Sequence, residues 1–342
     1  MKIIDLRSDT VTRPSAAMLD AMLRAEVGDD VFNEDPTIIQ LEAFGASLFG
    51  KEAGLFCPSG TMTNQIAIKV HTQPGDELIC DVNSHIYNYE GGGISANSGV
   101  QARLVSGHEG RLSAAMIEPF INADYDWLTR TSLVSLENTI NRAGGSYYSI
   151  PQIQEIHQFC RDKQLKLHLD GARIFNALIE TGESSRQVGS YFDSISICLS
   201  KGLGAPVGSL LLGDKTFIKK ARRTRKLFGG GMRQAGILAA AGLYALQNNI
   251  ARLKEDHQRA KKIEEALQTL PFIESVLPVY TNIVIFHLKK DMLSGDAFEK
   301  LLAAENIRVS AFGKQTVRMV THLDFTEEML TKTLVVLKSL KF

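Results

Sequence analysis

Short apolar segments alternate with helix-type patterns through the first two thirds of the 342-residue chain. Each apolar segment has the length of one strand, and the segments between them carry the apolar spacing of amphipathic helices. Parallel strands are buried on both faces, so they form continuous apolar runs, and they are connected through helices. The alternation therefore predicts an α/β fold with a mostly parallel sheet that helices cover on both faces.

The predicted strands of this sheet are residues 53–56, 77–81, 132–137, 165–170, 194–199 and 208–212. The predicted helices are residues 36–48, 60–70, 153–163, 215–226 and 232–248. The pattern changes near Asn249, where a long charged helix is followed by short strands (282–288, 308–310, 316–321) and helices (295–305, 326–340). We therefore predict two domains: a large domain with an N-terminal arm, residues 1–248, and a small C-terminal α+β domain, residues 249–342.

Charge and cysteine content limit the partners and the location. Lys plus Arg and Asp plus Glu both number 38, and this balance argues against nucleic acid or an anionic membrane as the main partner. The six basic residues of 219–226 fit a solvated helix face. The N-terminal residues lack the apolar core of a signal peptide, and the most apolar stretches are too short to span a bilayer. The four cysteines have neither metal-type nor disulfide-scaffold spacing, so we expect reduced thiols in the cytoplasm.

Three common motifs are incomplete in this chain. Residues 45–51 nearly match a phosphate-binding loop, but Glu52 stands where Ser or Thr would hold magnesium. The glycines that follow Lys201 lack the spacing of a dinucleotide-binding turn. The eight histidines include no H-E-x-x-H. We therefore expect neither nucleotide-loop chemistry nor a catalytic metal.

Lys201 follows a buried strand and begins a Gly-rich turn. In open α/β sheets ligands bind at the carboxyl ends of the strands. A lysine buried there is costly unless it is neutralised, and a Schiff base with an aldehyde neutralises it. From this segment alone, a surface loop lysine is an equally good interpretation.

Asp170 also ends an apolar strand. A carboxylate at this position can keep a pyridine nitrogen protonated, although it can also cap the next helix. Three residues further on, Arg173 would face the same crevice, where its planar guanidinium can hold a carboxylate through two hydrogen bonds.

Two further segments complete the pattern. Gly60 and Thr61 follow an apolar strand and open a helix, whose free N–H groups suit a phosphate, although the segment also fits an ordinary helix cap. His85 lies a few residues beyond the strand 77–81, where an imidazole can stack on a flat ring or simply belong to a loop. Together, a phosphate seat, a stacking ring, an acid for a ring nitrogen and a Schiff-base lysine predict pyridoxal phosphate (PLP) as the cofactor.

The chain resembles the low-specificity L-threonine aldolases, which belong to the fold-type I group of PLP enzymes. The resemblance covers nearly the whole chain and rests on residues 6–10, 28–31, 34–36, 58–61, 136–139, 168–173, 198–209, 229–234 and 320–324. It implies a PLP-dependent lyase that cleaves the Cα–Cβ bond of L-threonine or L-allo-threonine to glycine and acetaldehyde. It also implies a homotetramer built from pairs of close dimers.

The resemblance assigns roles to individual residues. Lys201 is expected to bind PLP covalently, Asp170 to pair with the pyridine nitrogen, and His85 to stack on the ring. Gly60 and Thr61 are expected to hold the phosphate, with Arg233 of a neighbouring subunit. The substrate carboxylate is expected to bind Ser8, Arg173 and Arg318. The base that accepts the hydroxyl proton is either His85 or a water molecule that His85 holds.

Three positions depart from the family pattern. Trp127 and Ile140 stand where family members carry histidines, and Phe32 stands where a tyrosine is common. We expect these departures to alter the pocket for the β-hydroxyl group and leave the cofactor residues unaffected. The alternatives are another fold-type I enzyme, such as an aminotransferase or a β-eliminating lyase for aromatic amino acids, and a non-catalytic protein on the same fold.

Overall fold

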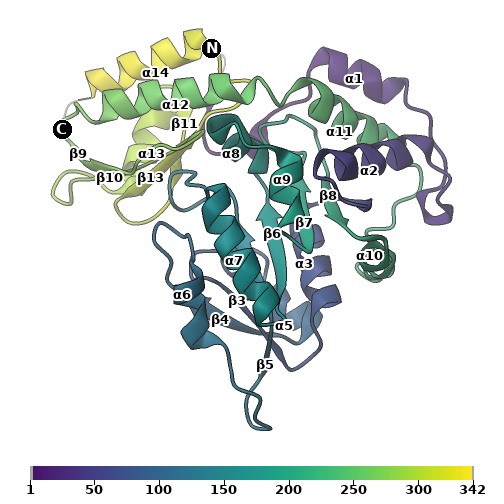
Figure 1. Ribbon diagram of the computed structural model, residues 1–342. Coiled ribbons are helices and arrows are strands. Elements are labelled where there is room, and N and C mark those ends of the chain that lie inside the picture. Colours follow the sequence, from purple (N-terminus) through teal and green to yellow (C-terminus); the bar gives the residue numbers. More distant parts are fainter. Residues whose placement is uncertain (1–2, 341–342) are drawn as a thin grey trace.

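The computed structural model describes residues 3–340 and is built around a seven-stranded sheet of order β2-β8-β7-β6-β5-β3-β4 (Figure 1). In that order the strands are β2 (Ala53–Cys57), β8 (Ser209–Gly213), β7 (Ser194–Cys198), β6 (Lys166–Gly171), β5 (Arg130–Glu137), β3 (Asp76–Asp81) and β4 (Gln101–Val105). β8 runs antiparallel to both of its neighbours, and the other six strands run in one direction. The predicted α/β class with a mostly parallel sheet is confirmed.

Helices cover both faces of this sheet. On one face α3 (Gly60–His71) packs on β5 to β8, and α5 (Gly93–Ser98) and α10 (Lys215–Leu227) lie beside it. On the other face α2 (Pro36–Leu48) and α7 (Ile150–Asp162) contact the strands. Further helices are α1 (Ala16–Leu23), α4 (His85–Asn88), α6 (Ala114–Ile117), α8 (Ile174–Thr181), α9 (Ser185–Ser190) and α11 (Gly236–Asn248), with short 3-10 turns η1 (Asp9–Val11), η2 (Asp30–Phe32) and η3 (Glu118–Phe120).

The two faces of the sheet are packed differently. On the α2 face the apolar side chains form one continuous cluster. Under α3 they form two separate clusters, one around β2, β8 and α10 and the other around β3, β5 and α5. Between these clusters β6 and β7 present buried polar side chains to α3, namely His168, Asp170, Ser194 and Ser196. Because side chains alternate along a strand, this polar strip lies directly opposite the apolar residues of the same two strands.

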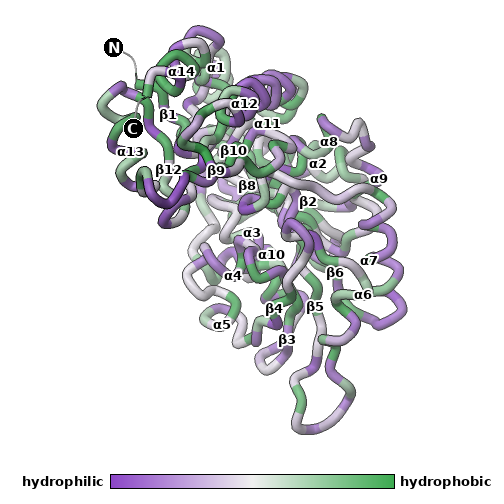
Figure 2. The backbone as a smooth tube through the Cα atoms, turned by 90° about the vertical axis from the view of Figure 1, so that its left-hand side faces the viewer, coloured by the Kyte–Doolittle hydropathy of each residue, from purple (hydrophilic) through white to green (hydrophobic). Residues whose placement is uncertain are grey.

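The C-terminal part forms a second unit with a four-stranded antiparallel sheet. Its strands in order are β12 (Ser310–Ala311), β13 (Thr316–Val320), β10 (Ile283–Leu288) and β9 (Ile273–Val276), and its helices are α12 (Leu253–Leu267), α13 (Gly295–Ala304) and α14 (Glu327–Ser339). Most residues of α12 are hydrophilic (Figure 2). The first strand of the chain, β1 (Ile4–Asp5), pairs in parallel with β11 (Ile307–Arg308), and its Ile4 shares one apolar cluster with Phe286. The division at residue 249 stays a prediction.

Most element boundaries agree with the predicted ones within about three residues, and a few predictions are wrong. The predicted strand 308–310 is two short strands, β11 and β12, which belong to different sheets. The helix expected from residue 232 begins at Gly236, whose N–H donates to the Asp35 carboxylate over 2.9 Å. The sequence pattern did not predict the strands β1, β4 and β9, nor the short helices α1, α4, α5, α6, α8 and α9 and the three 3-10 turns. Among the described helices, none combines the length and the apolar character that a bilayer crossing requires.

Candidate active site

The predicted cofactor residues meet at one edge of the large sheet. Asp170 lies at the end of β6, and Lys201 follows β7 after a short turn. His85 begins α4 shortly after β3, and Gly60 begins α3 after β2. Because these strands are parallel, their carboxyl ends share one edge. One polar atom each of His85, Asp170 and Glu90 lies within 4.8 Å of the others.

An asparagine joins the two buried carboxylates of this edge. Nδ2 of Asn64 donates to Oδ2 of Asp170 over 3.0 Å and to Oε1 of Glu90 over 2.9 Å. Gln65 donates to the other oxygen of Glu90 over 2.7 Å. Glu90 in turn contacts Nδ1 of His85 over 3.0 Å. Glu90 and Asn64 were not predicted as site residues, because a carboxylate in a loop and an amide inside a helix carry no strand-end signal.

Glu90 determines how His85 can act. Burial lowers the pKa of His85, but the hydrogen bond to Glu90 and the charge of Asp170 together outweigh burial and raise it above its usual value. The charge of Lys201 contributes in the opposite direction. Since Nδ1 faces a carboxylate, it carries the ring proton and leaves Nε2 as the nitrogen that can accept a proton from a ligand.

Arg173 is already held by a carboxylate of its own chain. Its Nε and Nη2 donate to the two oxygens of Asp9 over 2.7 Å each, and both side chains are buried. Asn282 adds a hydrogen bond to Asp9 over 3.3 Å. Burial opposes the charge of Asp9, but Arg173 holds the pKa of this carboxyl far below its usual range. The sequence predicts Arg173 as a bidentate ligand of the substrate, whereas here the bidentate partner is Asp9 and Nη1 is the nitrogen left over.

Arg318 reaches the same region from β13 in the C-terminal unit. Its Nη1 donates to Oδ1 of Asn141 and its Nη2 to the carbonyl of Arg7, each over 3.0 Å. Its Nε is buried and has no acceptor among the described residues. Burial, followed by the positive charge of Arg173, lowers the pKa of Arg318 to about 10. Two close guanidinium groups, each with an N–H to spare, form a site for an anion.

Glu137 connects the part of the site around His85 with the part around Arg318. One of its oxygens accepts the backbone N–H of His85 over 2.7 Å, and the other accepts that of Asn141 over 2.8 Å. Burial and the negative charge of Asp170 raise the pKa of Glu137 to about 7. Glu137 ends strand β5 as Asp170 ends β6. The strand-end rule that predicts Asp170 therefore also indicates Glu137, which we did not single out.

The N-terminus of α3 offers hydrogen-bond donors. Ser59 accepts the N–H of Met62 over 3.2 Å, whereas the N–H groups of Gly60 and Thr61 have no acceptor in residues 3–340. The hydroxyl of Ser209, which is buried close to Gly60, also lacks a partner there. A Cβ atom on Gly60 would lie 2.6 Å from Sγ of Cys198, so this position admits glycine alone without a rearrangement.

Several predicted residues do not reach this group within one chain. The exposed Arg233 pairs with Asp29 over 3.0 Å, and Phe32 is 69% exposed. Ile140 is buried in the core. Trp127 is 77% exposed and precedes the amino end of β5, on a loop that projects beyond the sheet (Figure 1). Trp127 therefore does not line the site that its own chain builds. Ser8 directly precedes Asp9, and its hydroxyl accepts hydrogen bonds from the backbone N–H and the hydroxyl of Thr10.

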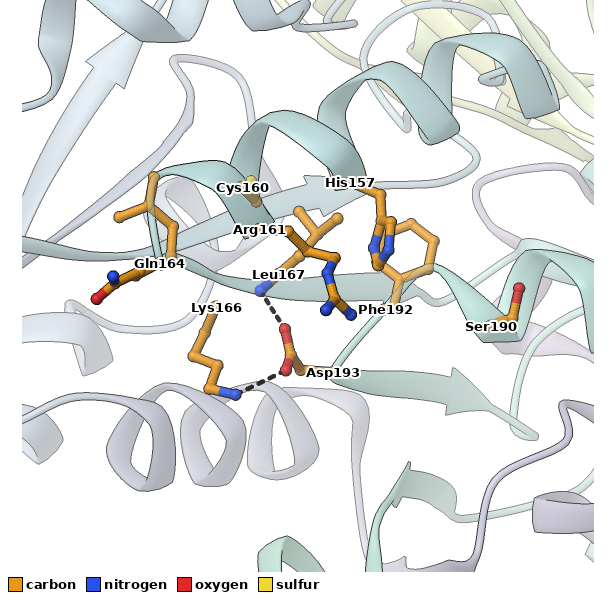
Figure 3. A pocket seen from close by; sticks show the side chains of 10 residues that line it. His157, Cys160, Arg161, Gln164, Lys166, Leu167, Ser190, Phe192 and Asp193 are labelled. Carbon is orange, nitrogen blue, oxygen red and sulfur yellow. Dashed lines mark hydrogen bonds and ion pairs between the residues drawn. The ribbon is translucent and has the colours of Figure 1, made fainter.

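A separate hollow of about 450 Å³ lies at the opposite edge of the sheet (Figure 3). There the carboxylate of Asp193 accepts hydrogen bonds from the amine of Lys166 and from the N–H of Leu167. These residues stand at the amino ends of β6 and β7, so the hollow is remote from Lys201.

Comparison with known proteins identifies the class first. A family model described as beta-eliminating lyase matches residues 5–291. With the α/β fold and the lysine, carboxylate and histidine at one sheet edge, this match defines the chain as a member of that enzyme class.

Relatives narrow the class to one family. The chain is 44% identical to the low specificity L-threonine aldolase of Escherichia coli K12 over 96% of its own length and 97% of the relative. It is 38% identical to the low specificity L-threonine aldolase of Saccharomyces cerevisiae over 96% and 84%. The chain belongs to the low-specificity L-threonine aldolase family.

Two solved structures show the same fold. A threonine aldolase from Leishmania major superimposes with a TM-score of 0.83 at 21% identity and covers 98% of each chain. A serine palmitoyltransferase from Sphingomonas wittichii superimposes with a TM-score of 0.76 at 16% identity, covering 99% of this chain and 87% of that one.

Proposed function

We propose that this protein is a PLP-dependent lyase that cleaves the Cα–Cβ bond of β-hydroxy-α-amino acids. L-threonine and L-allo-threonine would give glycine and acetaldehyde. The observation that carries this proposal is the position of Lys201 at the strand edge that also holds Asp170 and His85. Membership of a family whose named relatives are L-threonine aldolases supports it.

The side chains at this edge fit PLP in their chemistry. A phosphate requires N–H and hydroxyl donors, and the N-terminus of α3 offers those of Gly60 and Thr61. A pyridine nitrogen requires a carboxylate, and Asp170 is held in that role by Asn64. An aldehyde requires an amine, and the amine of Lys201 makes no hydrogen bond or ion pair within the described chain. We assign these residues to PLP, with Arg233 of a second subunit at the phosphate.

Bound PLP supplies a ring that withdraws electrons from the bond to be broken. The protein supplies orientation. The guanidinium groups of Arg318 and Arg173, with the nearby Ser8, would bind the substrate carboxylate and so determine which bond at Cα stands ready to break. His85, with its Nδ1 proton donated to Glu90, would accept the proton of the β-hydroxyl group at Nε2, directly or through one water molecule.

The test is an assay with each threonine diastereomer that measures glycine and acetaldehyde. We expect both products from the wild-type protein, and a loss of roughly 10⁴-fold or more in Lys201→Ala, together with loss of the cofactor that borohydride traps on the chain. Lys215→Ala on the exposed start of α10 is the control and should keep full activity. Amino transfer to a keto acid without acetaldehyde would contradict the proposed reaction.

We also infer a homo-oligomer, in the form of a tetramer, in the cytoplasm. The residues that the family resemblance places at the site but that one chain leaves outside, Arg233, Phe32 and Trp127, are all exposed. Large apolar side chains are also exposed on the neighbouring helices α1 and α11, namely Leu23 at 86% and Ile237 at 46%. The four cysteines are buried and unpaired, which suits a reducing compartment.

A further inference from the structure

A continuous chain of buried hydrogen bonds runs along the sheet from Asp170 towards the opposite edge. Oδ1 of Asn64 contacts Nε2 of His168 over 3.1 Å, and Nδ1 of His168 contacts the hydroxyl of Ser194 over 2.8 Å. The same hydroxyl contacts Nε2 of His71 over 2.8 Å. Asn64 and His71 lie seven residues apart on α3, and a helix presents such residues on one face.

The donor and acceptor capacity of each group determines the direction of every hydrogen bond in this series. The NH₂ group of Asn64 faces two carboxylates, which accept only, so its Oδ1 must accept from His168. His168 then carries its proton on Nε2 and accepts from Ser194 at Nδ1. Ser194 in turn accepts from Nε2 of His71. This direction requires a neutral His168, because its Nδ1 accepts, and burial lowers the pKa of His168 to about 3 and that of His71 to about 4.

These hydrogen-bonded side chains occupy space under α3 that apolar side chains would otherwise fill. His168 and Ser194 stand between the two apolar clusters that flank this helix, where apolar side chains would join them into one. Burying polar groups costs stability unless every hydrogen bond is made, so such a strip needs a reason other than packing. We look for this reason at the Asn64 end of the strip, because Asn64 contacts both Asp170 and Glu90.

We propose that Asn64 is a positioning residue that holds the carboxylates of Asp170 and Glu90 together, and that His168, Ser194 and His71 fix its amide in the orientation that does so. This inference rests on the proposed function, in which Asp170 serves the cofactor and Glu90 orients His85. Without His168 the buried oxygen of the Asn64 amide loses its donor, and the amide is then free to move away from the two carboxylates.

Two substitutions of His168 separate hydrogen bonding from packing. Gln offers an N–H for Asn64 and an oxygen for Ser194, whereas Phe fills the space of the ring and offers neither. We expect His168→Gln to keep kcat within about threefold, and His168→Phe to lower kcat roughly tenfold or more while KM for threonine changes less than about threefold. A packing role would reverse the order of the two variants, and that result would overturn the proposal.

A second measurement needs no cofactor. The pKa of His85, followed by NMR in cofactor-free protein and assigned with His85→Gln, depends on the groups that face it: Glu90, Asp170, Glu137 and Lys201. Loss of the amide donor makes Glu90 and Asp170 stronger acceptors, so we expect this pKa to rise by roughly half a pH unit or more in Asn64→Ala and in His168→Phe. An unchanged pKa in both variants would contradict the proposal.

The control is Asn176→Ala. Asn176 is also a buried asparagine that contacts a histidine, with Nδ2 3.1 Å from Nε2 of His257, but it lies outside the strip. It should lower the melting temperature about as much as Asn64→Ala and leave the pKa of His85 in place. If wild-type protein fails to cleave threonine, the proposed function fails, and the NMR comparison still decides what Asn64 does.

Discussion

Asp9 shows how a single buried charge can be held in the interior. Its carboxylate meets the guanidinium of Arg173 through two bonds and the amide of Asn282 through a third. Breaking a buried pair leaves an unpaired charge away from water, which costs far more than losing an exposed pair. The pair therefore fixes the N-terminal arm to the site more firmly than contacts on the surface of the arm do.

We expect Asp9→Asn to lower the free energy of unfolding by about 3–5 kcal/mol, because the buried Arg173 loses its counter-charge. Asp5→Asn is the control in the same arm. Asp5 pairs with the half-exposed Arg7 over 2.6 Å, and such pairs contribute about 0–1 kcal/mol. Urea unfolding of the two variants at one protein concentration measures the difference. Equal losses would show that Arg173 does not depend on Asp9.

The buried His168 predicts how stability depends on pH. Unfolded histidine takes up a proton near pH 6.5, whereas burial holds the pKa of His168 in the folded chain at about 3. The unfolded state then binds more protons between these values, so the free energy of unfolding decreases as the pH falls below 6.5. We expect His168→Gln to reduce this decrease by roughly 1 kcal/mol per pH unit between pH 4 and 6. Parallel pH profiles for the two proteins would contradict the expectation.

Residues at strand ends could be predicted from the sequence, and their partners could not. Lys201 and Asp170 follow apolar runs, and the rule that ligands bind at carboxyl ends is local to each run. Asn64 reaches Asp170 across 106 positions of the chain, and Asp9 reaches Arg173 across 164. The local sequence pattern cannot predict a pairing between residues so far apart. The prediction of a substrate role for Arg173 therefore did not include the Asp9 carboxylate that holds its guanidinium.

At the scale of elements, α3 depends on how closely its first turn approaches β7. We expect Gly60→Ala to push this turn away from Cys198, since the new Cβ would lie 2.6 Å from Sγ, and to weaken PLP binding roughly tenfold. A fluorescence titration with PLP measures the change. The double variant Gly60→Ala, Cys198→Ala makes room for the methyl group and should recover most of the affinity. Failure to recover would mean that close approach is not the cause.

Most strands of the large sheet and the longer helices were predicted, whereas the edge strand β4, the two-residue strand β1 and shorter helices such as α8 were not. β6 and β7 are buried along almost their whole length, and apolar residues stand at alternate positions in each of them. β4 lies at the edge of the sheet and is half-exposed over most of its length, so Gln101 and Arg103 interrupt its apolar pattern. β1 and β11 are two residues long, and they exist because they pair with each other across the whole chain.

At the scale of the whole molecule, the proposed completion of the site by Arg233 of a second subunit leads to a direct prediction. Lys201→Ala and Arg233→Ala should each be inactive or nearly so alone. Mixed oligomers of the two should regain about a quarter of the activity, because some sites then take Lys201 from one chain and Arg233 from the other. Refolding the two variants together and assaying threonine cleavage measures the gain. Activity no greater than that of the separate variants would place Arg233 in its own chain's site or in none.

The pairing of β1 with β11 has a consequence for biosynthesis. Ile4 leaves the ribosome about 300 residues before its partner Ile307. The central sheet can form while translation continues, whereas the arm must wait until β11 has been made before it can dock. Ser8 and Asp9 lie on that arm and Arg318 lies on β13, so the part of the site that we assign to the substrate carboxylate is assembled last. In a nascent chain the residues that we assign to the cofactor can therefore come together before those that we assign to the substrate.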